Sequence, residues 1–375
     1  MKKHLLATAF AVAGLGMAAL PALAKDYKLA SIQSVTGIYA FVGVPLTKGI
    51  ELGVDQVNAS GMLGAGNKLV LEKQDPASDR TQAVTLMTRF GNDANTLLVL
   101  GPSSTIEALA AGPAAQAAKL PQITNGALPQ LLKVNDQLFR TLIPIPESWG
   151  LIANYAATNL KSKRCALITV SDNEGYMYQR ELVKQGLVAK GVEIVSDELP
   201  RGSETDYSAI ATKIASRNPD CMILNGPAEQ MANMIIQVKQ AGLSPAAHVF
   251  IDSGGGSANF LKAGGKMVEG VYVLTPFFAP GSTPMARKFS ADYEKRFGEA
   301  PDNWSALGYA SVQVVAAAIK AAGANVTRET LTAELKKTKD LPVVLGEGTM
   351  SIGADRETHY DLTVLTVKDG KWAFP

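Results

Sequence analysis

The amino-acid sequence predicts an α/β protein with two lobes, each built around a doubly wound parallel sheet. Short apolar segments typical of strands alternate with longer amphipathic segments typical of helices, which is the pattern of βαβ units. The alternation pauses over residues 139–148 and then restarts on the same plan. Without its first 24 residues the 375-residue chain keeps 351, too many for one compact core and about right for two lobes.

The first 24 residues have the pattern of a secretory signal peptide. Lys2 and Lys3 precede an apolar run over 5–20, and a small-x-small cleavage site ends at Ala24. The run is too short and wrongly flanked to span a membrane stably. We therefore predict cleavage after Ala24, export to the periplasm and no stable membrane insertion.

The first series of elements belongs to the first lobe. We expect strands over 28–35, 69–74, 97–100 and 122–124. We expect helices over 47–58, 78–93 and 105–118, the last with a break at Gly112-Pro113. The segment "FRTLIPIPES" (139–148) is less polar than most surface loops, and we interpret it as an extended crossing between lobes.

The second series repeats the plan and then changes near the C-terminus. We expect strands over 165–170, 193–199, 221–225 and 248–251, and helices over 179–190, 207–216 and 229–241. An extended segment over 270–275 is a candidate for the return to the first lobe, and helices follow over 285–297, 306–322 and 327–337. Residues 358–375 alternate with period two around Asp369-Gly370, which predicts a hairpin.

The two cysteines leave two alternatives open. Cys165 and Cys221 each begin an apolar strand-like run, so they pair in an oxidising compartment if those strands are neighbours. The other alternative is that each is a small buried hydrophobic residue. We favour the second, because adjacent parallel strands rarely offer the geometry of a disulfide.

Charge and motifs exclude several classes of function. Without Lys2 and Lys3 the 36 basic residues become 34, equal to the 34 acidic ones, so no nucleic-acid partner is expected. No nucleotide-binding loop, nucleophile elbow or His/Cys cluster with metal-ligand spacing occurs after Ala24. We therefore expect no catalytic residues, no metal and no cofactor.

Small, hydroxyl and aromatic residues follow the predicted strands, where open α/β sheets form a ligand crevice. Ser103, Ser104 and Thr105 follow a strand and begin a helix, so hydroxyl and backbone N–H groups can hold an anion there. Tyr39, Phe41 and Tyr176 are candidates for apolar walls. The strand ends thus predict a site for a small carboxylate.

Several segments, in order, carry a family resemblance. They are "SVTGIYAFVGVPLTKGIELGVDQVNASGML", "VLGPSST", "LPQITNGALPQL", "SDNEGYMYQREL", "GSETDYSAIATKI" and "NPDCMILNG". The chain resembles the Leu/Ile/Val-binding proteins, the periplasmic solute-binding proteins of branched-chain amino acid ABC transporters. The resemblance implies a type I periplasmic binding fold, with two lobes joined by three hinge crossings near Thr141, Thr275 and Leu345. The expected lobes are 25–141 with 275–345, and 142–274 with 346–375.

The resemblance also implies ligand-binding residues. It places the carboxylate loop at 101–105, a loop that helps to hold the amino acid backbone at 125–128 (Asn125, Ala127), and the second-lobe aromatic at Tyr176. Gly254 stands where the family has the acid that pairs with an α-ammonium group. An unpaired buried ammonium costs several kcal/mol, about 3–5. Either Asp252 or another acid such as Glu229 supplies the charge, or the ligand is not an amino acid.

From these observations we expect a monomer that binds a small carboxylate without changing it. The ligand is either an aliphatic amino acid or a non-amino carboxylic acid with an aromatic or aliphatic body. The closed form is expected to dock on the membrane permease of an ABC transporter. The alternative is an exported sensor of the same fold that signals to a regulatory partner.

Overall fold

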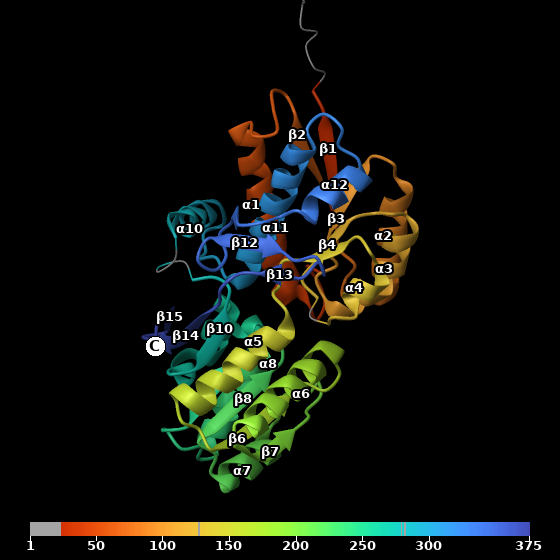
Figure 1. Cartoon of the computed structure of the whole chain (residues 1–375). Coiled ribbons are helices and arrows are strands. Elements are labelled where there is room, and N and C mark those ends of the chain that lie inside the picture. The colour runs from red at the N-terminus through yellow and green to blue at the C-terminus, as the bar shows by residue number, and fades with distance from the viewer. Residues whose placement is uncertain (1–23, 127, 279, 281–282) are drawn as a thin grey trace, which may run out of the picture.

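The first lobe is built around a five-stranded parallel sheet (Figure 1). The computed structural model describes residues 24–126, 128–278, 280 and 283–375. The strands of this sheet are β1 (Asp26–Ile32), β2 (Lys68–Gln74), β3 (Thr96–Leu100), β4 (Gln122–Thr124) and β5 (Leu138–Arg140), in the order β2-β1-β3-β4-β5. Its helices are α1 (Ala40–Ser60), α2 (Arg80–Asn92), α3 (Thr105–Ala117) and the short α4 (Leu131–Val134).

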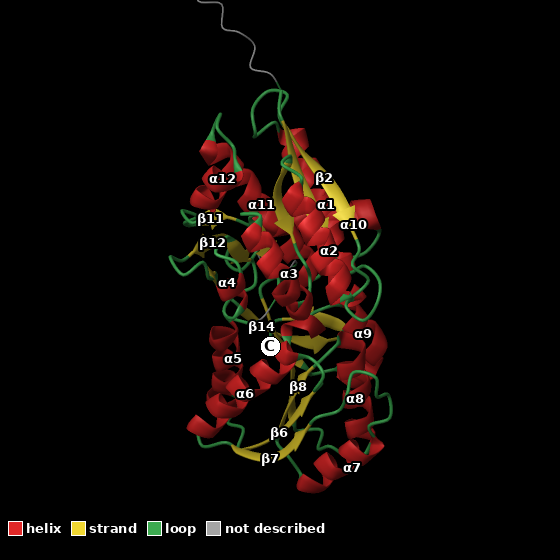
Figure 2. Cartoon of the chain, turned by 90° about the vertical axis from the view of Figure 1, so that its right-hand side faces the viewer, coloured by secondary structure: helices red, strands yellow, loops and turns green. Residues whose placement is uncertain are grey.

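The second lobe is built around a seven-stranded sheet with helices on both faces (Figure 2). Its strands are β6 (Arg164–Thr169), β7 (Glu193–Glu198), β8 (Cys221–Asn225), β9 (His248–Ile251), β10 (Tyr272–Thr275), β14 (Thr363–Lys368) and β15 (Lys371–Ala373). Its helices are α5 (Ile145–Asn154), α6 (Glu174–Ala189), α7 (Ser208–Arg217), α8 (Ala228–Gln240) and α9 (Ala258–Gly264). Strands β14 and β15 are antiparallel and meet at the predicted Asp369-Gly370 turn. The two-lobed α/β architecture predicted from the sequence is confirmed.

Three helices after β10 return to the first lobe: α10 (Pro284–Phe297), α11 (Asn303–Ala322) and α12 (Arg328–Leu335). A small antiparallel sheet of β11 (Leu341–Pro342), β12 (Thr349–Ile352) and β13 (Thr358–His359) follows them. The predicted extended segment 270–275 does not itself cross, because β10 pairs with β9 and β14 inside the second sheet.

The last passage between the lobes differs in position from the expected one near Leu345. Thr358 Oγ1 donates to the carbonyl oxygen of Arg140, and Arg356 Nη1 donates to that of Asn135 at 2.7 Å. These bonds keep β12 and β13 with the first lobe. The chain therefore enters the second lobe between β13 and β14.

Two sequence predictions about prolines were wrong. Helix α3 continues through Gly112-Pro113 without a break, and Gly112 packs closely against Val134. The segment predicted as extended over 139–148 ends in the first turn of α5, which begins after Pro144 and has Pro146 in its first turn. Proline suits this position, because the first N–H groups of a helix have no intrahelical partner.

Helices α1 and α11 cross at backbone contact in the first lobe. A Cβ atom added to Gly49 would lie 2.0 Å from the carbonyl oxygen of Ser305, and one added to Gly308 would lie 2.4 Å from that of Leu46. Helix α11 is long and apolar enough to pass for a membrane span, but 72% of its apolar window is buried inside the protein. It is a core helix of the first lobe.

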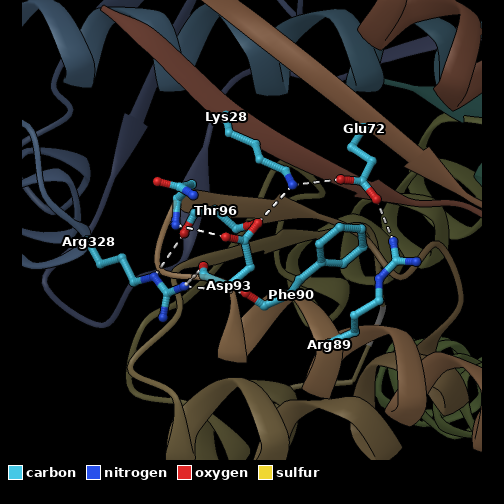
Figure 3. A network of polar contacts seen from close by, with 8 residues as sticks. Lys28, Glu72, Arg89, Phe90, Asp93, Thr96 and Arg328 are labelled. Atoms are coloured by element: carbon cyan, nitrogen blue, oxygen red, sulfur yellow. Dashed lines mark hydrogen bonds and ion pairs between the residues drawn. The ribbon is translucent and has the colours of Figure 1, made fainter.

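Arg328 fastens α12 to the edge of the first lobe that lies away from the second (Figure 3). Its guanidinium donates to the carbonyl oxygens of Thr96 at 2.9 Å, Asp93 at 2.7 Å and Ala118 at 2.9 Å. These carbonyl groups stand at the start of β3 and just after α2 and α3. One side chain thus satisfies backbone acceptors that the helix ends leave open.

The prediction that the two cysteines stay unpaired was wrong. Strands β6 and β8 are adjacent, and their register sets Cys165 directly opposite Cys221. The Cα atoms are 4.3 Å apart and the two sulfur atoms form a disulfide. Pairing therefore followed from strand order and register, which the sequence alone did not provide.

Replacing both cysteines by alanine should lower the free energy of unfolding by about 3–4 kcal/mol, because the bond closes a loop with a sequence separation of 56. Denaturant unfolding with and without dithiothreitol measures this. The reduced wild type should match the double variant, and the variant should not respond to reductant. Equal unfolding midpoints for oxidised wild type and variant would contradict a stabilising role.

Candidate functional site

One cavity lies between the lobes, where the carboxyl ends of the strands of both sheets meet. The centre of a water molecule can occupy about 70 Å³ of it. It is lined from both sides, and nine of the ten residues expected at the site contribute to its wall. These are Tyr39, Phe41, Ser103, Ser104, Thr105, Asn125, Tyr176, Asp252 and Gly254. The tenth, Ala127, lies outside the described residues.

The first-lobe wall is the start of α3. Ser103 Oγ accepts from the backbone N–H of Ser34 at 3.2 Å, which leaves its own hydroxyl hydrogen to donate elsewhere. Ser104 caps the helix and donates its hydroxyl to the Glu107 carboxylate. Glu107 also accepts from Ser34 Oγ at 2.6 Å, and burial raises its pKa. Of the two serines, Ser103 is therefore the one whose hydroxyl can reach a ligand.

The second-lobe wall is the start of α6, and it bonds to the first lobe across the cavity. Asn173 caps α6 by accepting from the backbone N–H groups of Gly175 and Tyr176. Its side-chain amide also donates to the Tyr39 hydroxyl at 3.2 Å. A second bond between the lobes joins Asn303 Nδ2 to the Ser253 carbonyl oxygen at 2.7 Å. These two bonds join the lobes on either side of the cavity.

Asp252 lines the cavity and holds together the backbone beneath it. Its carboxylate accepts from the N–H groups of Gly254 at 2.6 Å and Gly226 at 3.0 Å. Burial raises its pKa to about 7 despite these hydrogen bonds. The closest acid to the position expected to hold an ammonium group thus already has structural hydrogen bonds on both of its oxygens.

Gln179 and Trp304 line the cavity from opposite lobes, on α6 and at the start of α11. Their exposures are 7% and 8%. Gln179 Oε1 and Trp304 Nε1 are both buried without a hydrogen-bond partner. Each of these two atoms is almost completely covered by the surrounding protein.

Sequence reasoning missed seven residues of the wall. They are Val42, Leu142, Asn173, Gly175, Gln179, Ser253 and Trp304. Asn173 had a usable signal, since an Asn before an amphipathic run is a typical helix cap. Trp304 had none, because α11 reaches the cavity only through its packing on α1.

Metal and catalytic chemistry find little support in the described part of the chain. Within it, no group of three or more His, Cys, Asp or Glu side chains could hold a metal. His248 lies in β9 outside the cavity, and His359 lies 3.9 Å from Glu147 on the surface. The arrangement is that of a binding site, with donors, acceptors and aromatic walls.

Two α/β lobes that close on a small cavity, joined by several crossings, define a hinge-closing solute-binding protein. The chain belongs to the periplasmic binding protein family, whose family model matches residues 26–371. The predicted resemblance to the Leu/Ile/Val-binding substrate-binding proteins of ABC transporters is confirmed. Proteins of this family are exported to the periplasm and bind small molecules.

Similar proteins cover nearly the whole chain. The Leu/Ile/Val-binding protein BraC3 of Rhizobium johnstonii is 27% identical over 348 residues, 91% of each chain. LivJ of Streptococcus pneumoniae, solved with isoleucine, has a TM-score of 0.85 at 24% identity, over 93% of this chain and 98% of LivJ. A Rhodopseudomonas palustris solute-binding protein, solved with benzoate, has a TM-score of 0.82 at 19% identity, over 93% of this chain and 95% of its own.

The raised pKa of Asp252 predicts a pH dependence of stability. An acid with a folded pKa of about 7 and an ordinary value of 3.8 favours the folded state most below about pH 4. That contribution is lost as the pH rises through 7, by ~4 kcal/mol at most. Asp252→Asn should flatten this fall, measured by urea unfolding from pH 4 to 8.

Burial raises the pKa of Asp302 to about 6. This residue therefore also makes the free energy of unfolding fall as the pH rises, and the Asp252→Asn variant keeps that part of the fall. The difference in unfolding free energy between wild type and variant is therefore the quantity to follow. A difference that does not change with pH would show that Asp252 is ionised throughout.

Proposed function

We propose that this protein is the periplasmic substrate-binding component of an ABC importer of the branched-chain amino acid type. It captures a small carboxylate-bearing solute between closing lobes and releases it unaltered to a membrane permease. The observation that carries this proposal is a cavity walled by the strand ends of both lobes, with the start of α3 on one side. In this proposal the signal peptide is removed after Ala24 and the mature protein is a monomer.

The carboxylate is proposed to lie at the start of α3. The N-terminus of a helix attracts negative charge through its unpaired backbone N–H groups. The free hydroxyl hydrogen of Ser103 adds a donor, and Asn125, held by a 2.9 Å bond to Thr141 Oγ1, stands beside it in the wall. Tyr39, Phe41 and Tyr176 supply apolar surface for the body of the ligand.

Two kinds of ligand fit the proposal. The complexes of LivJ with isoleucine and of the Rhodopseudomonas protein with benzoate support an amino acid and a non-amino aromatic acid, respectively. Closure is favoured because a ligand that contacts both walls binds the closed state more tightly than the open one. Bonds such as Asn173 to Tyr39 then add to the closed state.

Isothermal titration calorimetry of the ligand-free protein tests this function. The panel comprises branched-chain amino acids and simple aromatic and aliphatic carboxylates, with the matching uncharged amides as controls. We expect one-to-one binding of at least one carboxylate and weaker binding of its amide. If the folded protein binds no carboxylate of the panel, the proposal fails.

The two serines at the start of α3 should respond differently to substitution. Ser103→Ala removes the hydroxyl that is free to donate and should weaken carboxylate binding by about tenfold, the cost of a hydrogen bond to a charged group. Ser104→Ala removes the cap and should lower the free energy of unfolding by about 1 kcal/mol. Calorimetry and denaturant unfolding of both variants separate the two effects. Unchanged affinity in Ser103→Ala would mean that the carboxylate lies elsewhere.

A further inference from the structure

A buried glutamate lies next to the proposed carboxylate site. Glu107 belongs to the first turn of α3, and its side chain is 0% exposed. Its carboxylate accepts hydrogen bonds from the hydroxyl of Ser34, at 2.6 Å, and from that of Ser104. Ser104 lines the cavity, and the described residues of the cavity wall include no lysine, arginine or histidine. Glu107 therefore shares the start of α3 with the carboxylate of the proposed ligand.

Two carboxylates at one helix start repel each other. A carboxyl group next to a like charge in a buried place is protonated more easily. Burial raises the pKa of Glu107, and the charge of Asp75, in the loop after β2, raises it further. Binding of an ionised carboxylate adds another negative charge, which a proton on Glu107 offsets. Ligand binding and the protonation of Glu107 are therefore coupled.

Other ionisable groups stand near this part of the cavity. Burial raises the pKa of Tyr39, before α1, and the charges of Glu107 and Asp172 raise it further, so Tyr39 keeps its proton. Asp252 lines the cavity from the second lobe. The charge of Arg80, at the start of α2, acts on the pKa of Tyr39 in the opposite direction. The acids in this region outnumber this cation, which favours a protonated carboxyl group.

The hydrogen bonds of Glu107 show what a proton changes. A serine hydroxyl has one hydrogen to donate, and Ser104 donates it to ionised Glu107. With a proton on the same oxygen, Glu107 becomes the donor, and the hydrogen of Ser104 is released towards the cavity. Ser34 is fully buried and is not part of the cavity wall, so the same reversal there offers nothing to a ligand. The ligand thus gains a second hydroxyl donor besides Ser103.

We propose that Glu107 binds a proton together with the carboxylate of the ligand, reverses its hydrogen bond with Ser104, and so adds the Ser104 hydroxyl to the donors of the site. This inference rests on the proposed function and concerns the regulation of the same site. The proton comes from the solvent on binding and returns to it on release. Glu107 is a positioning residue, because it acts on the ligand through Ser104.

Calorimetry of the wild type between pH 5.5 and 8 tests the coupling. The probes are benzoate, 4-methylpentanoate and leucine, whose carboxylates stay largely ionised over this range. Because binding raises the pKa of Glu107, the affinity is highest at low pH and is lost as the pH rises. The best-binding probe should bind about fivefold or more tightly at pH 5.5 than at pH 8, as for a pKa raised by about one unit or more. Titrations in buffers of different ionisation enthalpy should show net proton uptake.

Variants assign the proton to Glu107. Glu107→Gln mimics the protonated form, because an amide donates and accepts without charge. It should bind the same probe about fivefold or more tightly than wild type at pH 8 and show no pH dependence, whereas a merely structural role predicts weaker binding. Adding Ser104→Ala should remove this gain. Glu329→Gln, in the first turn of α12 and outside the cavity, is the matched control and should bind like wild type.

A second measurement needs no variant of Glu107. In Asp252→Asn, proton uptake should persist, and infrared difference spectroscopy should show the carbonyl band of a newly protonated carboxyl group on binding. Thermal unfolding establishes that each variant is folded.

The outcomes separate this inference from the proposed function. Three results would each overturn the inference while a carboxylate-binding protein remains. They are a wild-type affinity that does not change with pH, weaker binding by folded Glu107→Gln at pH 8, and proton uptake that is lost in Asp252→Asn but kept in Glu107→Gln. If none of the three probes binds to the folded wild type, the proposed function fails and the inference fails with it.

Discussion

Parallel strands bring all their carboxyl ends to one edge of a sheet, and here the two sheets turn those edges towards each other. Every part of the candidate site depends on this constraint. Residues that follow β3, β4, β6 and β9 are far apart in the sequence, yet they line one cavity. A chain that alternates strands and helices in two series thus builds a site from loops and the first turns of helices, and the sheets supply rigid support.

The polar side chains around the cavity have two roles: some hold the surrounding protein in place, and others can bind a ligand. Three side chains fix the shape of the wall through hydrogen bonds within the protein. Ser104 donates to Glu107, and Asn173 and Asp252 accept from nearby backbone N–H groups. Ser103 keeps its hydroxyl hydrogen available for a ligand. The first three side chains preorganise the cavity, and Ser103 offers a donor to what it binds.

Much of the fold and of the candidate site could be predicted from the sequence, because strand ends and helix starts follow from the local sequence pattern. Alternation and turn residues predict the loops at 101–105 and 252–256, and residues 103–105 and 252–254 face the same cavity from opposite lobes. Tertiary contacts account for what was missed. Trp304 arrives through the crossing of α11 with α1, the cysteines pair through strand register, and the prolines of α5 begin a helix that reads locally as extended.

The glycine crossing of α1 and α11 has a consequence for how such a cleft can diversify. Gly49 and Gly308 leave no room for a side chain, so the two helices are locked at backbone distance. The crossing therefore fixes the separation of two residues that line the cavity: Tyr39, just before α1, and Trp304, on the first turn of α11. New solutes can then be accommodated by exchanging single loop residues while the frame that carries them stays constant.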